Sequence, residues 1–164
     1  GKPESIRCTD FKGPDAMEYL RAGAPMPLVS RIVEVGGKKL LDGGVADPIP
    51  LAAFRRMGYG RNIVVLTRPA GYRKKPASPL PFQAVYHSYP AFVQAMADRH
   101  AVYNREVAAA ECGVADGSVL LLRPSTDLNI SRTERSVQKL RQLYELGRSD
   151  TLARLGELKH FCQK

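Results

Sequence analysis

An aspartate followed by two glycines is the part of this sequence best suited to chemistry. The apolar pair Leu40-Leu41 runs directly into Asp42, Gly43 and Gly44. Glycine takes positive φ angles without Cβ strain, so we expect a sharp turn immediately after the acid. A carboxylate fixed at such a place can accept a proton from a nearby hydroxyl and later return it, which is general acid and base catalysis. Asp42 is therefore the candidate catalytic residue, with Gly43 and Gly44 shaping its turn.

The residues before Asp42 predict a β-hairpin whose second strand ends directly before Asp42. Residues 28–35 are rich in β-branched side chains, which favour strands. Gly36-Gly37 is a typical two-residue hairpin turn, and residues 38–41 continue as the second strand. We therefore expect Asp42 at the carboxyl end of a strand.

The residues after the turn predict a crossover unit of an α/β fold. Asp47-Pro48 indicates a helix N-cap with proline at the first helical position, and the helix should run to Met57. Residues 62–68 form a nearly continuous apolar run, typical of a strand buried in a parallel sheet. Strand, helix and strand should then form a right-handed βαβ unit, with Asp42 at the sheet edge where open α/β sheets hold their sites.

The rest of the chain predicts further elements by periodicity and by its turn signals. Residues 69–90 should be a long loop, because five prolines interrupt them. The other expected elements are a strand at 5–9, a helix at about 16–22 opened by Pro14-Asp15, a long helix at 90–111 closed by Gly113, a buried strand at 118–124, a helix with a capping box at Ser131 and Glu134 that ends at Gly147, and a last helix at 150–161.

Several of these segments together resemble one enzyme family. Residues 39–50, the strand at 62–68 and Leu143-Tyr144-Glu145-Leu146-Gly147 follow the order seen in bacterial patatin-like phospholipases. Residues 21–27 are similar to that family's R-A-S-x-x-x-P approach to the site, with Gly23 in place of serine. In that family the D-G-G or D-G-A aspartate forms a Ser-Asp dyad with a serine on a G-x-S-x-G elbow.

The resemblance implies both a fold and an activity. It implies a three-layer α/β/α fold with a mainly parallel sheet, and hydrolysis of a phospholipid or simpler acyl ester. Asp42 would be the acid of the dyad, and no cofactor would take part. The expected substrate is therefore a lipid or another acyl ester.

The serine of that dyad is missing from this sequence. No serine has glycine at both the second position before it and the second position after it. Ser149 comes closest, two residues after Gly147, but it follows a helical pattern and reads as a helix cap. We therefore expect residues 1–164 to be the carboxyl-terminal portion of a patatin-like domain that lacks the nucleophile elbow and oxyanion loop. The chain alone should be inactive, with an uncovered sheet edge that pairs with the amino-terminal half or with another copy.

The charge of the chain favours anionic partners. Lys and Arg number 25 against 16 Asp and Glu, which gives a formal net charge of +9. Tyr72, Arg73, Lys74 and Lys75 form a basic cluster beside an aromatic ring, which suits an anionic membrane surface. Two alternatives to the enzyme stay open: a non-catalytic basic module that binds anionic lipid or nucleic acid, and a fragment that completes a sheet in another chain. For the enzyme itself we do not expect nucleic acid as a partner.

Other site types find little support in the sequence. The three cysteines lack metal-ligand spacing and suit reduced thiols. Asp47 could pair with Asp42 as a second carboxylate, but its place before Pro48 favours capping. We expect no metal and no cofactor. Without a membrane-length apolar run or a signal-peptide core, the sequence predicts a cytoplasmic protein that can lie peripherally at a membrane.

Overall fold

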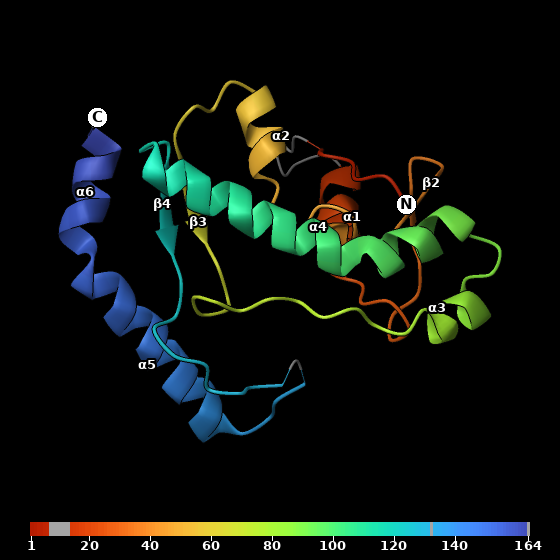
Figure 1. Cartoon of the computed structure of the whole chain (residues 1–164). Coiled ribbons are helices and arrows are strands. Elements are labelled where there is room, and N and C mark those ends of the chain that lie inside the picture. The colour runs from red at the N-terminus through yellow and green to blue at the C-terminus, as the bar shows by residue number, and fades with distance from the viewer. Residues whose placement is uncertain (7–13, 132, 164) are drawn as a thin grey trace. The chain divides into compact units, whose positions relative to one another are not determined.

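The computed structural model of the chain describes residues 1–6, 14–131 and 133–163, and it shows a mixed α/β protein (Figure 1). The chain divides into two compact units. Unit 1 comprises residues 1–53 and 74–107, and unit 2 comprises residues 54–73 and 108–164. The strand expected at residues 5–9 falls largely outside the described residues.

The elements follow one another along the chain in a mixed order. They are α1 (Pro14–Ala22), β1 (Val33–Val35), β2 (Lys38–Leu40), the 3-10 helix η1 (Gly43–Val45), α2 (Leu51–Arg56), β3 (Asn62–Val65), α3 (Leu80–Val85), α4 (Pro90–Ala115), β4 (Val119–Leu122), α5 (Val137–Ala153) and α6 (Leu155–Gln163). Every helix in the described residues is too short or too polar to cross a bilayer.

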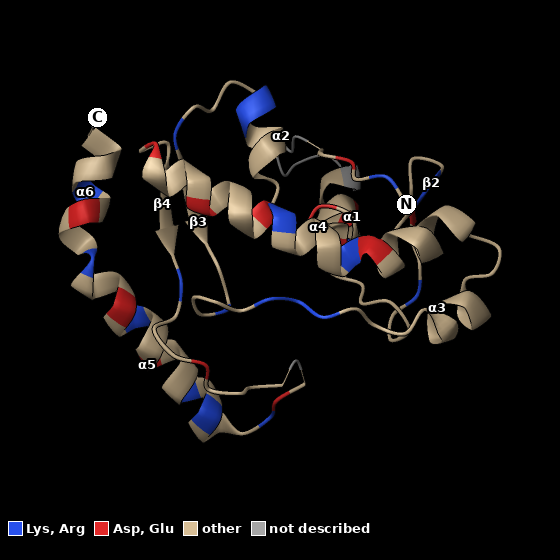
Figure 2. Cartoon of the chain, viewed as in Figure 1, with Lys and Arg blue, Asp and Glu red and all other residues tan. Residues whose placement is uncertain are grey.

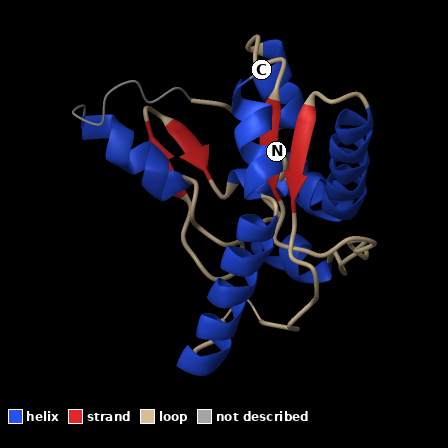
Figure 3. Cartoon of the chain, turned by 90° about the vertical axis from the view of Figure 1, so that its left-hand side faces the viewer, coloured by secondary structure: helices blue, strands red, loops and turns tan. Residues whose placement is uncertain are grey.

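The described strands form two separate pairs (Figure 3). In unit 1, β1 and β2 are antiparallel, with Val33 opposite Leu40. In unit 2, β3 and β4 are parallel, with Ile63 opposite Leu120. The expected βαβ unit between residues 38–41 and 62–68 is therefore wrong. The tight turn at Gly36-Gly37 pairs β2 with its near neighbour β1, and closing such a short loop costs little entropy.

The hairpin and α1 form a small core in unit 1. Ala22, Val33 and Val35 are buried together, with Tyr19 and Leu40 packed against them. Gly36 and Gly37 have φ angles of 56° and 73°, so the two-residue turn predicted from sequence is confirmed.

The first strand of the hairpin is shorter than expected, since β1 begins at Val33 rather than at residue 28. Leu28 has a φ angle of 68°, a left-handed conformation that no strand residue adopts. The hydroxyl of Tyr86 accepts the Leu28 backbone N–H at 2.9 Å, which ties this turn to the segment after α3.

In unit 2 the two strands differ in burial. All four residues of β4 are buried, as predicted for a strand covered on both faces. In β3, by contrast, Ile63 and Val65 are 42% and 69% exposed, so the same prediction is wrong there. The Arg154 guanidinium donates to the Leu121 carbonyl at 2.6 Å, so this side chain covers the edge of β4 away from β3.

The long helix α4 matches the predicted stripe but not its predicted end. Met96, Val107 and Ala110 are buried, as the periodicity indicated. Gly113 lies inside the helix rather than after it, and the chain turns at Gly117 with a φ angle of 74°. A Cβ at Gly113 would lie 2.5 Å from Cγ2 of Val119, so this glycine permits close approach of helix and strand.

Further helix boundaries also differ from the predictions. The loop expected at 69–90 contains the short helix α3. The Ser131 and Glu134 capping box does not start α5, which begins at Val137 with Ser136 as its N-cap. Gly147 and Ser149 both lie inside α5, so the predicted helix end and cap there are wrong.

A cavity bordered by Asp42

Unit 1 contains a cavity of about 760 Å³ beside Asp42. Residues 1–4, α1, the hairpin, the turn after Asp42 and the start of α4 contribute to its wall. Much of the lining is aromatic or aliphatic and includes Tyr19, Ile32, Leu40, Tyr86 and Phe92. Its volume lies in the range typical of sites that bind small organic molecules.

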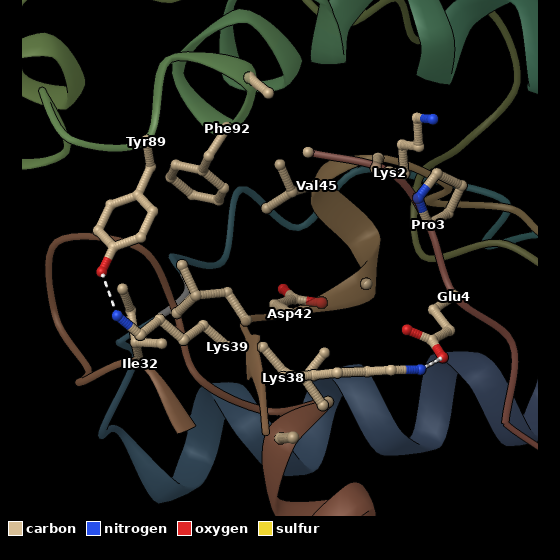
Figure 4. A pocket seen from close by; sticks show the side chains of 18 of the residues that line it. Lys2, Pro3, Glu4, Ile32, Lys38, Lys39, Asp42, Val45, Tyr89 and Phe92 are labelled. Atoms are coloured by element: carbon tan, nitrogen blue, oxygen red, sulfur yellow. Dashed lines mark hydrogen bonds and ion pairs between the residues drawn. The ribbon is translucent and has the colours of Figure 1, made fainter. Parts of the chain in front are cut away.

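Asp42 is half-buried and serves as the N-cap of η1. Its Oδ1 accepts the Gly44 backbone N–H at 2.8 Å, and its own backbone N–H donates to the Pro25 carbonyl at 3.3 Å. Figure 4 shows the carboxylate between the rings of Tyr89 and Phe92 on one side and residues 2–4 on the other. Asp42 therefore follows β2, as predicted, and its side chain lines the cavity.

The two glycines after Asp42 act differently from the prediction. Neither Gly43 nor Gly44 has a positive φ angle, because the chain enters a right-handed 3-10 turn at once. A Cβ on Gly44 would lie 3.1 Å from Oδ1 of Asp42, so glycine leaves room for the carboxylate to cap its own turn. A Cβ on Gly43 would meet open space.

Two lysines at the cavity have other partners than Asp42. Lys38 forms an ion pair with Glu4, and Lys39 donates from Nζ to the Tyr89 hydroxyl at 3.3 Å (Figure 4). The hydrogen bond to Glu4 raises the pKa of Lys38, and the hydrogen bond to Tyr89 raises that of Lys39. Both ammonium groups therefore remain charged at neutral pH at the border of the cavity.

The segment after Asp42 is attached to α4 at two points. Arg99 donates from Nε to the Gly44 carbonyl at 2.8 Å, and the Ile49 backbone N–H donates to Oε2 of Glu106 at 2.8 Å. Asp47 does not cap a helix starting at Pro48, because α2 begins only at Leu51. Its side chain instead acts on the Glu106 carboxyl, whose pKa it raises.

These contacts strongly affect the pKa of Glu106. Burial raises its pKa from an ordinary value of 4.5 to about 7, the nearby Asp47 charge adds to the rise, and the Ile49 N–H opposes it. In the described residues, no group of three or more His, Cys, Asp or Glu side chains could hold a metal ion.

The basic cluster predicted at Tyr72, Arg73, Lys74 and Lys75 is divided between the two units. In unit 2, the Arg68 guanidinium lies 5.1 Å from the Tyr72 ring centre, and Arg73 lies 3.6 Å from a carboxylate oxygen of Glu111.

In unit 1, the Lys74 ammonium lies 5.3 Å from the Tyr103 ring centre, and its backbone N–H donates to Asn104 at 2.8 Å. Lys75 is exposed. Figure 2 shows basic residues on many elements, with acidic residues beside them on α4. The role of these four residues at a lipid interface stays a prediction.

Sequence reasoning missed Arg99 and Glu106, and it took Phe92 as core only. Arg99 and Glu106 are seven residues apart, so they share one face of a helix. Two charges at this spacing beside the apolar stripe of α4 are the signal that could have indicated a contact with another segment.

Comparison with known families covers the second half of the chain. A family described as a domain of unknown function (DUF6363) matches residues 89–163, which is less than half of the chain. The matched region begins at Tyr89, so it includes Phe92, Arg99 and Glu106 but not Asp42. No match to this chain was found among curated proteins.

Proposed function

We propose that this chain supplies the acid of a Ser-Asp dyad in a patatin-like lipid acyl hydrolase. The observation that carries the proposal is the half-buried Asp42 carboxylate at the wall of a cavity of about 760 Å³ lined by aromatic and aliphatic side chains. An apolar cavity of this size suits an acyl chain, and a carboxylate beside it suits work on the ester bond.

In the proposed chemistry Asp42 accepts one proton and then gives it up again in each half-reaction. The carboxylate accepts the proton of the serine hydroxyl as the serine oxygen attacks the ester carbonyl, and it gives that proton to the departing alcohol. In the second half-reaction water attacks the acyl-serine, and Asp42 accepts a proton from that water and gives it to the departing serine oxygen. Oδ1 of Asp42 is engaged with Gly44, so Oδ2 is the oxygen proposed to meet the hydroxyl at about 2.6–3.2 Å.

The serine must come from residues outside this sequence, since no G-x-S-x-G pattern occurs in it. We infer a three-layer α/β/α fold whose mainly parallel sheet is completed by an amino-terminal half of the same domain. The asymmetry of unit 2 supports this inference: Arg154 covers the outer edge of β4, whereas Ile63 and Val65 of β3 are exposed. Ile63 and Val65 share one face of β3, and a further layer packed on that face would cover them.

Hydrolysis of p-nitrophenyl esters by a longer protein that includes the residues preceding Gly1 tests the proposal. Asp42→Asn should abolish hydrolysis while keeping the acceptor for the Gly44 N–H, and Asp42→Ala should abolish hydrolysis and also remove that hydrogen bond. Asp98→Asn is the matched control, since that exposed carboxylate bonds only Gln94 on its own helix in the described residues. Full activity in a folded Asp42→Ala protein would rule out the dyad.

A non-catalytic module that binds anionic lipid is the second candidate. The net charge of +9 and the charged Lys38 and Lys39 beside the cavity favour it. In either case we infer a cytoplasmic protein at a membrane surface. Co-sedimentation with phosphatidylglycerol vesicles but not with phosphatidylcholine vesicles, unchanged by Asp42→Ala, would support the module, provided no ester is cleaved. Equal binding to an oligonucleotide would instead indicate unspecific attraction to polyanions.

A further inference from the structure

We propose that Arg99 and Glu106 are positioning residues, which brace the segment after Asp42 against α4 and so fix the Asp42 carboxylate at the cavity wall. The catalytic meaning of this brace rests on the proposed function, whereas the brace itself does not. Both residues lie within unit 1 with the segment that they hold.

The first contact acts on the residue that holds Asp42. Gly44 donates its N–H to Oδ1 of Asp42 and accepts the Arg99 Nε–H at its carbonyl, each at 2.8 Å. Arg99 thus fixes the orientation of the residue whose N–H fixes the carboxylate. Without this contact, the 3-10 turn could rotate and carry the carboxylate away from the cavity.

The second contact holds the other end of the same segment. The Glu106 carboxyl accepts the Ile49 N–H at 2.8 Å, and the Asp47 side chain, two residues before Ile49, raises its pKa. Seven helical residues between Arg99 and Glu106 correspond to about 10 Å along the axis. Two contacts so far apart resist rotation of the segment better than either one would alone. The side chains of Val45 and Ile49, in the same segment, are buried.

The second contact should depend on pH. The charged groups that act on Glu106 are Asp47 from the braced segment and Arg105 from its own helix. Because burial raises the Glu106 pKa to about 7, its carboxyl carries a proton that it can share with Asp47 at lower pH. Above pH 7 the two carboxylates repel each other, and the brace should weaken.

Nuclear magnetic resonance on the 164-residue chain tests the brace without any assay of activity. The Ile49 amide resonance should shift with pH with a midpoint near 7, and the Gly44 amide should follow it. Glu106→Gln should abolish both transitions, since glutamine still accepts the N–H but does not titrate. Glu111→Gln on the same helix is the matched control and should leave them unchanged. Transitions that persist in Glu106→Gln, or a Gly44 amide that does not respond in the unaltered chain, would overturn the proposal.

Kinetics on the longer protein test the catalytic consequence. Arg99→Ala should lower kcat about 100-fold with little change in KM, because a displaced catalytic group impairs the reaction more than binding. Arg99→Lys should restore part of kcat. Glu106→Gln should remove a decline in kcat above pH 7. Unchanged kcat in a folded Arg99→Ala protein would contradict the positioning role, whereas an inactive parent protein would refute the proposed function and leave the resonance result to decide on the brace.

Discussion

The two strand pairs of this molecule differ in whether they depend on residues that are near in sequence or far apart in sequence. The hairpin of β1 and β2 in unit 1 is joined by two glycines, and its apolar residues pack against α1. The pair of β3 and β4 in unit 2 is parallel and joins residues more than fifty positions apart. Parallel pairs need a long connection and cover on both faces, whereas a hairpin needs only a turn and one packed face.

The difference indicates where the chain depends on distant residues. In unit 1 the hairpin is closed by its own two-residue turn and packs against α1, so residues near in sequence stabilise it. Asp42 follows this hairpin in the chain. In unit 2, β4 is buried throughout while Ile63 and Val65 of β3 are exposed. The parallel pair is therefore the region most sensitive to its packing partners, and changes there should have the largest effects.

The largest effect is expected at Gly113, where α4 approaches β4. Gly113→Ala would place a Cβ 2.5 Å from Cγ2 of Val119 and 2.8 Å from Nη2 of Arg55. The arginine end can move, but the strand side chain is buried, so we expect a loss of about 1–3 kcal/mol in unfolding free energy. Urea denaturation measures this loss.

Gly147→Ala is the matched control for that prediction. Gly147 also lies inside a helix of unit 2, yet a Cβ there would meet nothing within 4 Å. The helix preference of alanine should then raise the unfolding free energy by up to about 1 kcal/mol. Equal changes at both positions would show that the close contact of α4 with β4 does not limit the residue at 113.

The next effect concerns the side chain that covers β4. Arg154→Met removes the hydrogen bond to the Leu121 carbonyl and should lower the unfolding free energy by about 1 kcal/mol. Arg21→Met in unit 1 is the control, because Arg21 pairs only with exposed Glu18 in the described residues and such pairs contribute little. Thermal unfolding compares the two variants, and an equal drop in Tm would argue against a special role for Arg154.

These comparisons also show which features the sequence could predict. The hairpin turn at Gly36-Gly37 and the buried strand β4 were predictable because each has a local signal in two to four residues. The partner of β3 was not, because an apolar run does not specify which neighbour it pairs with. Gly113 was read as a helix end, since composition alone cannot distinguish a glycine that stops a helix from one that admits a neighbouring strand.

The candidate site likewise contains features that the sequence could predict and features that it could not. Asp42 and its place after a strand were predictable from an apolar pair, an acid and two glycines. The need for glycine at position 44 was not predictable, because it depends on the Asp42 side chain turning back toward the backbone of its own turn. Arg99 and Glu106 act on residues 55 and 57 positions away. Their spacing places them on one helix face, but nothing in one sequence specifies which segment that face contacts.

A smaller effect is expected at the open side of β3. Val65→Lys should reduce self-association of the chain, because lysine on an exposed strand disfavours pairing with another edge. Stability should change little, since Val65 is 69% exposed. Glu34→Lys on the exposed face of the hairpin is the control. Light scattering at rising concentration gives the oligomer size, and a chain that is monomeric before the change would argue against an open pairing edge.

A further effect is a change in the pH dependence of stability, and it contrasts two acids of α4. Burial raises the Glu106 pKa from 4.5 to about 7, so the folded chain binds more protons than the unfolded chain between these values. Stability should therefore fall as pH rises from about 4.5 to about 7, and Glu106→Gln should remove that part of the decline. Glu111 in unit 2 instead lies 3.0 Å from Arg123, and Glu111→Gln should leave the Glu106 contribution intact. Urea titrations at several pH values compare the two variants; the same slope in Glu106→Gln and in the unaltered chain would mean that the carboxyl pair with Asp47 does not contribute to the stability of unit 1.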